Sequence, residues 1–282
     1  MKKFTALLLA FAMIFAFAAC SDSDGGGSAS DSNLSNVTPD NSNTPAAQSD
    51  MEYVKGKGTL VVGITDFAPM DYQNESGEWI GFDADMARAF AERLGVEVVF
   101  QVIDWNNKVF ELDGKTIDVV WNGMTLTDEV KAAMECSKPY CNNAQVVIVR
   151  ADVADQYQTV ESLSALNFAV ESGSAGQQQA DANGLSYIEV LDQATALLEV
   201  KSNTADAAII DSLMAGAMVG EGTDYADLTY TVGLNSEEYG VGFRKGSDLA
   251  AELNAFFADA YADGSMQACA ETYGVQAALI AQ

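Results

Sequence analysis

The sequence predicts an α/β protein with two lobes, each a sheet flanked by helices, and a ligand cleft between the lobes. Segments typical of strands and helices alternate from residue 59 onward, as in parallel sheets covered by helices. The alternation starts again after residue 140, and a final strand and helix near the C-terminus can rejoin the first set. Two lobes joined in this way leave a cleft, which is where small ligands commonly bind.

The first set of elements begins with the apolar strand "TLVVGI" at residues 59–64. A helix is expected over residues 81–95, where apolar residues share one face and Asp83 can cap the start. Strands at residues 96–102 and 116–121 follow. The order strand, helix, strand is typical of a βαβ unit, so these strands are expected to form a parallel sheet.

The second set repeats this order. Strands are expected at residues 144–149, 167–170, 186–190 and 205–211, and helices at residues 159–166, after the loop 171–176, and at 194–200. The last pair is a strand at residues 238–244 and an amphipathic helix at 247–264. The second set therefore predicts another sheet covered by helices.

The N-terminal residues predict export and anchoring. Residues 1–19 have the features of a signal peptide, with Lys2 and Lys3 ahead of an apolar stretch. The stretch ends in "FAAC", which resembles a bacterial lipobox and makes Cys20 the lipidated first residue of the mature chain. An ordinary signal peptide with a chance cysteine is the alternative. Residues 20–50 are rich in Ser, Asp, Asn and Gly, so we expect a disordered, lipid-anchored tether on the outer face of the cytoplasmic membrane, as on a Gram-positive cell.

Charge and composition exclude several functions. The formal net charge is −27, and loss of Lys2 and Lys3 with the signal peptide takes the mature chain to −29. This acidity argues against nucleic-acid binding, which needs clustered lysine and arginine. The chain has no histidine, and its cysteines lack the spacing of zinc ligands, so neither a metal nor a cofactor is expected. Cys136 and Cys141 either form a disulfide or serve as small core residues, and we favour the core role for them.

Seven motifs follow one another along the chain: "LVVGITDFAPMDY", "GEWIGFDADMARAFAERLGVEVVF", "IDVVWNGMTLTDE", "SKPY", "AVESGSAG", "DAAIID" and "YGVGFRKGSDL". Each motif alone is a weak signal. In this order and spacing they resemble the extracytoplasmic solute-binding proteins of ABC importers, in the polar amino-acid branch of the family 3 type and in lipoprotein form. The resemblance covers residues 60–274.

The resemblance implies the two-lobed periplasmic-binding-protein type II fold. Two crossing strands, near residues 140–145 and 236–240, would join the lobes. Lobe 1 would comprise residues 51–140 and 239–282, and lobe 2 residues 141–238.

The resemblance also implies which residues contact the ligand. Asp211 matches a carboxylate that receives an α-amino group, assisted by the Gly123 carbonyl and the Thr125 hydroxyl. Trp105 matches an aromatic that stacks on the ligand, and the helix start at Ser174 favours an anion. Alternatively, Asp211 caps the following helix and Trp105 is a core aromatic. The other implied ligand contacts are Asp66, Phe67, Met124, Ser172 and Ala175.

The chain departs from the family pattern where an arginine normally clamps the ligand's α-carboxylate. Val130 occupies that position, and none of the four arginines matches it. In the alternative we favour, N–H groups at the helix starts near Thr127 and Ser174 hold the carboxylate, with help from Lys131. In a second alternative, acidic residues such as Glu171 favour a ligand bound through its cationic groups. In a third, the ligand has no carboxylate.

These features predict a binding protein rather than an enzyme. We expect it to capture a small polar solute, an amino acid, by lobe closure and to deliver it to separate ABC permease subunits. One alternative is a dehydratase-like enzyme on the same fold, with Glu171 as a general acid. Another is a ligand sensor that passes lobe closure to a receptor.

Overall fold

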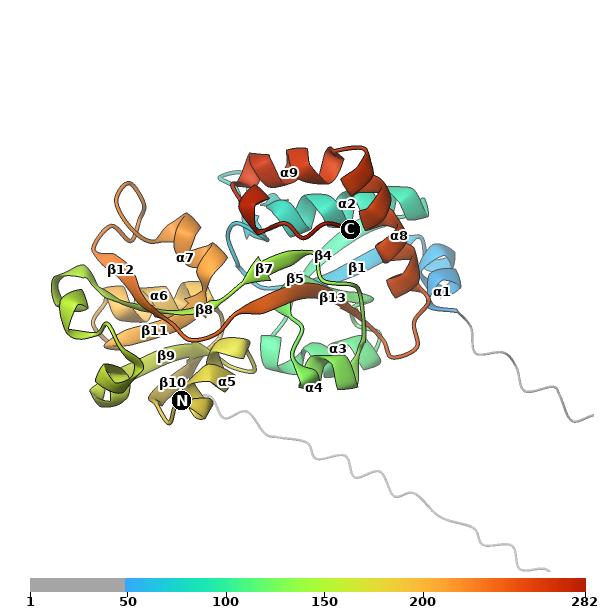
Figure 1. The fold of residues 1–282 in the computed structure, drawn as a ribbon. Coiled ribbons are helices and arrows are strands. Elements are labelled where there is room, and N and C mark those ends of the chain that lie inside the picture. Colours follow the sequence, from blue (N-terminus) through green and yellow to red (C-terminus); the bar gives the residue numbers. More distant parts are fainter. Residues whose placement is uncertain (1–48) are drawn as a thin grey trace, which may run out of the picture. The chain divides into compact units, whose positions relative to one another are not determined.

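The computed structural model describes residues 49–282, which form one folded unit with two large β-sheets (Figure 1). The expected signal peptide, the lipidation site at Cys20 and nearly all of the expected tether lie outside the described residues. In the part of the chain that the structure describes, every helix is too short or too polar to span a membrane.

The first sheet is built around the predicted βαβ unit. Its strand order is β4-β1-β5-β13-β6. β1 (Thr59–Ile64) pairs in parallel with β4 (Glu97–Val102) and β5 (Val119–Thr125). β13 (Glu237–Phe243) arrives from the C-terminal part of the chain and pairs antiparallel with β5, so this strand rejoins the first set as expected. Two short strands pair with β13, namely β6 (Glu135–Cys136) and β7 (Cys141–Asn143).

Helices cover both faces of the first sheet (Figure 1). α2 (Phe82–Leu94), α8 (Leu249–Ala262) and α9 (Ser265–Tyr273) pack together on one face over a large apolar core. α3 (Lys108–Asp113) and α4 (Asp128–Ala133) cover a smaller core on the other face. The short helix α1 (Asp50–Lys57), which the apolar pattern did not predict, packs beside β1.

The second sheet has the strand order β10-β9-β11-β8-β12. β9 (Asn167–Glu171), β10 (Ser186–Val190) and β11 (Ala207–Asp211) run parallel, so their carboxyl ends meet at one edge of the sheet. β8 (Gln145–Arg150) and β12 (Leu228–Gly233) complete the sheet, and β8 pairs antiparallel with both β11 and β12.

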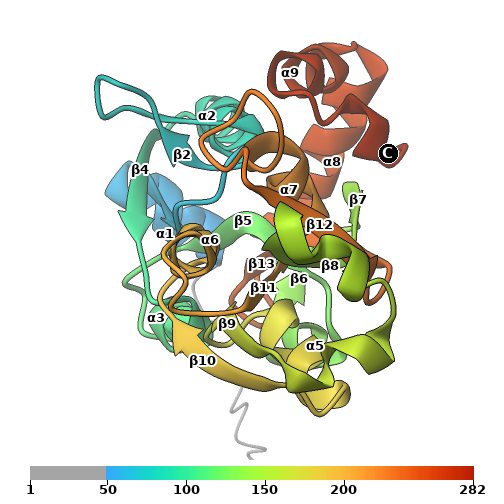
Figure 2. The same ribbon diagram turned by 90° about the vertical axis from the view of Figure 1, so that its left-hand side faces the viewer.

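Helices also cover both faces of the second sheet (Figure 2). α6 (Gln193–Lys201) and α7 (Ser212–Met218) pack on one face. α5 (Ala175–Ala182) and the 3-10 helix η3 (Val160–Ala165) pack on the other. The remaining short elements are β2 (Tyr72–Gln73), β3 (Trp79–Ile80), η1 (Trp105–Asn107), η2 (Ala151–Gln156) and η4 (Gln276–Ala278).

Two chain segments run between the sheets and pair with each other. β7 leads into β8 after a single residue, and β13 lies against β7 with Glu237 opposite Asn143 and Tyr239 opposite Cys141. Both segments coincide with the expected crossing strands. The lobe boundaries at residues 140 and 239 remain our proposal for how the chain divides.

The expected helix cap at Asp83 is wrong. The α2 helix starts one residue earlier than this cap requires, because the buried Phe82 is already helical and Gly81 is the capping residue. Asp83 is buried in the first turn, and its Oδ2 accepts hydrogen bonds from the Gly123 N–H (2.6 Å) and the Tyr140 hydroxyl (2.7 Å). Its role is therefore to hold the end of β5 against α2.

The cysteines follow the core alternative. Cys141 is fully buried, Cys136 and Cys269 are half-buried, and all three are free thiols. Burial raises the pKa of each thiol above its ordinary value, so these groups are poorly reactive.

Candidate ligand-binding site

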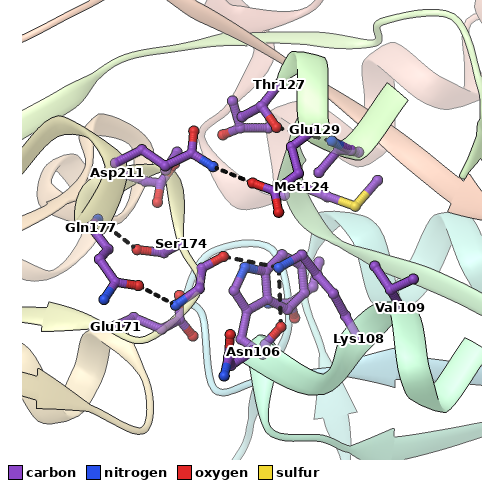
Figure 3. Close-up of a pocket in the computed structure, with 18 of the residues that line it drawn as sticks. Asn106, Lys108, Val109, Met124, Thr127, Glu129, Glu171, Ser174, Gln177 and Asp211 are labelled. Carbon is purple, nitrogen blue, oxygen red and sulfur yellow. Dashed lines mark hydrogen bonds between the residues drawn. The ribbon is translucent and has the colours of Figure 1, made fainter. Parts of the chain in front are cut away.

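A cavity of about 360 Å³ lies between the two sheets (Figure 3). The end of β5, the start of α3 and α4 line it from the first sheet's side. The ends of β9 and β11 and the starts of α5 and α6 line it from the second. The carboxyl ends of strands and the starts of helices thus surround one space, which is the usual place for a ligand in α/β proteins.

The structure brings seven of the ten predicted contact residues to this cavity. They are Trp105, Gly123, Met124, Thr125, Ser174, Ala175 and Asp211. Because these residues come from segments far apart in the sequence, their meeting at one cavity is a property of the fold. Their contacts with a ligand remain predictions.

The structure does not place Asp66, Phe67 or Ser172 in the cavity lining. Phe67 is buried behind Gly123, where an added Cβ would lie 2.3 Å from its Cε1. The Ser172 hydroxyl donates a hydrogen bond to Glu189 at 2.5 Å. Asp66 lies on the surface beyond the end of β1. Of these three residues, Phe67 supports the cavity wall from behind, Ser172 is bound to Glu189, and Asp66 lies outside the lining.

Asp211 is the acceptor for a dense set of hydrogen bonds. Its Oδ1 accepts from the Tyr239 hydroxyl (2.6 Å), the Gln145 side-chain amide (3.0 Å) and the Asn143 amide. Its Oδ2 accepts from the Gln193 amide. Asp211 is also the N-cap residue of α7, as the alternative predicts, but its side chain makes no capping hydrogen bond. Burial raises the pKa of Asp211 to about 7, although these hydrogen bonds pull it down.

Glu237 on β13 is a second, half-buried acceptor, which the sequence reading missed. Its Oε1 accepts from the Thr125 hydroxyl (2.8 Å) and from the side-chain amides of Asn143 (2.7 Å) and Gln145 (2.8 Å). Because Thr125 donates its proton to Glu237, it can offer a ligand only its oxygen lone pair. The polar residues of the crossing strands are thus bound mainly to one another.

Lys108 is the cation that the sequence reading missed. It is 8% exposed, and its Nζ donates to the carbonyl of Trp105 at 3.1 Å and to that of Gly173 at 2.9 Å (Figure 3). Its Nζ also lies 4.9 Å from the centre of the Trp105 ring. The contact with Gly173 ties α3 to the loop before α5 across the cavity. The i, i+3 spacing from Trp105 in a helical segment was the available sequence signal.

Glu171, at the end of β9, differs from Asp211 in having a buried oxygen without a hydrogen-bond partner. It is 3% exposed, and its Oε1 is fully buried without a hydrogen-bond partner, while the Gln193 side chain is the one donor near its carboxyl group among residues 49–282. Burial raises the pKa of Glu171 to about 8, and the negative charges of Asp211 and Asp192 add to this, while Lys108 opposes it.

The charge of the lining is mostly negative. Glu129 and Asp181 join Glu171 and Asp211, and Glu129 accepts a hydrogen bond from Gln178 across the cavity at 3.3 Å. Among the described residues that line the cavity, Lys108 is the one basic side chain, and none is an arginine. A cavity with this charge suits a ligand that carries donors or positive charge.

The helix starts offer fewer free N–H groups than expected. The N–H of Val130 is taken by the Thr127 hydroxyl at 3.1 Å, and that of Gln177 by the Ser174 hydroxyl at 3.1 Å. The Gly173 N–H donates to the Gln177 side chain at 2.7 Å. Lys131, expected to assist, is not part of the cavity lining. These contacts weaken the favoured alternative for holding a carboxylate.

The fold and this cavity define a protein that encloses a small ligand between two lobes. Residues 60–276 match the model of the bacterial extracellular solute-binding proteins, family 3. This match covers most of the sequence, so the chain belongs to that family.

Named relatives and solved structures agree with this assignment. The L-cystine-binding protein TcyJ of Escherichia coli (strain K12) is 29% identical over 224 residues, covering 78% of this chain and 84% of the relative. The arginine-binding extracellular protein ArtP of Bacillus subtilis (strain 168) is 26% identical over 274 residues, covering 95% and 96%. A crystal structure of a mutant ArgBP from T. maritima superposes with a TM-score of 0.75 at 32% identity, covering 80% of this chain and 99% of that one.

Proposed function

We propose that this protein captures an amino acid outside the cytoplasm and delivers it to the permease of an ABC importer. Membership of a solute-binding family supports this proposal, as do relatives named for cystine and arginine binding. The observation that carries it is the cavity between the lobes, where Trp105, Thr125 and Asp211 meet. Its volume of about 360 Å³ is at the small end of ligand pockets, as a single amino acid requires.

Capture proceeds by closure of one lobe on the other. The crossing segments β7 and β13 are the natural hinge, since they alone join the proposed lobes 51–140 with 239–282 and 141–238 in the described chain. The contacts of Lys108 with Gly173 and of Glu129 with Gln178 span the cavity and belong to the closed arrangement. A ligand favours closure only to the extent that it binds the closed form more tightly.

The protein is held at the membrane by its N-terminus. In this part of the proposal, residues 1–19 are removed, Cys20 carries lipid, and residues 20–50 act as the tether to the outer face of a Gram-positive cytoplasmic membrane. Metabolic labelling with a clickable fatty acid tests it. Label on the wild-type chain that is absent from Cys20→Ser supports the anchor, and equal release of both chains into the medium contradicts it.

A ligand screen tests the central proposal. Denatured protein is analysed by mass spectrometry for co-purified small molecules, and the ligand-free protein is titrated calorimetrically with the common amino acids. We expect saturable one-to-one binding of at least one amino acid. If no amino acid binds but a neutral sugar or an inorganic anion does, the amino-acid assignment is wrong. Turnover of a prephenate-like substrate would instead support the dehydratase alternative.

Transport and sensing differ in the partner. Reconstitution of the protein with the permease encoded beside it should give ligand-stimulated ATP hydrolysis. If closure stimulates a receptor kinase and no permease, the sensor alternative is correct.

A further inference from the structure

Two buried carboxylates end neighbouring parallel strands at the cavity, but their surroundings differ. Asp211 ends β11 and Glu171 ends β9, and Gln193 at the start of α6 lies beside both. Both carboxylates line the cavity. Each is therefore within reach of the same enclosed ligand, and the one with free acceptor positions will be the one that binds it.

Asp211 has little capacity left for a ligand. A carboxylate has about four acceptor positions, and protein donors already occupy four in total, three of them on Oδ1. Oδ1 is therefore fully occupied, and Oδ2, which already accepts from Gln193, can accept at most one hydrogen bond from a ligand. Protein donors thus occupy most of the acceptor positions through which Asp211 would bind the ligand's cationic group, the role that the family pattern assigns to it.

Glu171 has more acceptor positions free than Asp211. Its Oε1 has no hydrogen-bond partner, the nearby Gln193 amide already donates to Asp211, and no basic side chain in the described chain lies within 4.0 Å of it as an ion pair. Lys108 is the nearest cation in the lining, but it is committed to the carbonyls of Trp105 and Gly173. A buried carboxyl oxygen without a partner is costly, and because Glu171 lines the cavity, a donor on the ligand can supply the missing partner.

We propose that Glu171 binds a positively charged group of the ligand and selects a basic amino acid over neutral ones. This inference rests on the proposed amino-acid-binding function and adds the residue that decides the ligand's charge. The excess of carboxylates over the single lysine in the lining favours the same net positive ligand. The raised pKa of Glu171, about 8, is consistent with a carboxyl group that ionises when a cation arrives.

Calorimetric titration of three proteins tests this inference. The wild type, Glu171→Gln and the exposed control Glu221→Gln are each titrated with L-arginine, L-lysine, L-glutamine and cadaverine. We expect the wild type and the control to bind a basic amino acid more tightly than L-glutamine. Loss of the buried charge should weaken basic ligands by about thirtyfold or more, whereas L-glutamine should change little. Thermal unfolding of each variant verifies that it is folded.

Proton release gives a second readout that a purely structural role would not change. Titrations in buffers of different ionisation enthalpy should show the wild type releasing a proton at pH 7 when L-arginine or L-lysine binds. The groups that face Glu171 are Asp211 on β11, Asp192 before α6 and Lys108 on α3. The difference between wild type and Glu171→Gln isolates the contribution of Glu171 from theirs.

The outcomes separate the two proposals. If L-glutamine binds best and Glu171→Gln leaves every affinity unchanged, Glu171 does not select charge, although the amino-acid function stands. If cadaverine binds in a Glu171-dependent way but no amino acid does, the residue assignment stands and the amino-acid function fails. If none of these four ligands binds but another amino acid does in the wider screen, the charge selection is wrong and the amino-acid function stands.

Discussion

Gly173 illustrates, at the residue scale, how closely the lobes approach. Its φ is +73°, which is left-handed, and a Cβ there would lie 2.7 Å from the Cα of Asn106 on the opposite side of the cavity. A side chain at this position would therefore strain the backbone and push the two loops apart.

Gly173→Ala is expected to weaken ligand affinity by about tenfold or more, because closure would need a shift of the backbone at the contact. Gly184→Ala is a matched control, since Gly184 also has a positive φ, +62°, but nothing within 4 Å of an added Cβ. Both variants share the backbone strain, so only the contact differs. Calorimetric affinities equal in the two variants would show that the approach of Gly173 to Asn106 is unimportant for binding.

Asp211 and Glu171 should respond in opposite ways to loss of charge. Asp211→Asn replaces an acceptor of four hydrogen bonds by a group that itself donates, and it should lower the free energy of unfolding by about 2 kcal/mol. Glu171→Gln removes a buried carboxyl group whose Oε1 has no hydrogen-bond partner, so it should be neutral or stabilising at pH 7.5. Urea unfolding measures both. Equal destabilisation by the two changes would contradict the difference in their surroundings.

At the scale of elements, Lys108 connects helix α3 with the loop that precedes α5. Lys108→Met keeps most of the side-chain volume but removes the two hydrogen bonds to Trp105 and Gly173. We expect about tenfold weaker ligand binding, since hydrogen bonds from a charged group contribute about 1.5–3 kcal/mol. Lys131→Met, on α4 and outside the cavity lining, is the control. A larger loss of affinity in Lys131→Met would instead support the role predicted from the sequence, in which Lys131 helps to hold the ligand's carboxylate.

Helix α1 is attached to the first sheet by charges rather than by a long apolar face. Arg244 is buried and pairs with Asp50 at 3.0 Å, while it also donates to the carbonyls of Leu112 (3.2 Å) and Ile117 (2.9 Å). A second pair joins Lys57 to Asp118 at 2.5 Å. Removing one partner of such a buried network leaves the others unpaired.

Arg244→Met should therefore lower the free energy of unfolding by about 3 kcal/mol. Arg150→Met is the control, because Arg150 pairs with Asp152 on the surface and should show no measurable change. Urea unfolding of both variants gives the comparison. An Arg244→Met protein as stable as the wild type would show that α1 is held by its apolar contacts alone.

At the scale of the whole molecule, several buried carboxyl groups make stability depend on pH. Burial raises the pKa of Asp83 to about 6, of Asp211 to about 7 and of Glu171 to about 8, and it raises that of Asp71 well above its usual range. In the unfolded chain these groups lose their protons near pH 4. Between these values the folded protein holds more protons, so its stability falls as pH rises.

The urea midpoint should accordingly be higher at about pH 5.5 than at about pH 8, and its slope should be steepest below about pH 6, where all these groups still hold their extra proton in the folded state. The net charge of −27 acts in the same direction, and added salt screens that part. Glu171→Gln should reduce the slope near pH 8. Ligand affinity should change in the opposite sense, rising up to about pH 8. A midpoint that increases with pH would contradict the pKa assignments.

Much of the architecture was predictable from the sequence. The apolar runs that became β1, β4, β8 and β10 were located to within about a residue, since alternation of apolar segments is a local signal. The short helix α3 was missed because six residues carry too little periodicity, and Asp83 was misplaced because a capping side chain and a buried one look alike in sequence.

The sequence by itself determined the order of the longer strands and helices it predicted and the family to which the chain belongs, because both depend on patterns between nearby residues. Only the tertiary structure decided which carboxylate remains free for a ligand. Lys108 meets Gly173 from 65 residues away, and Thr125 meets Glu237 from 112 residues away. Hydrogen-bond partners separated by such distances along the chain are chosen by the packing of the two lobes, which no local pattern records.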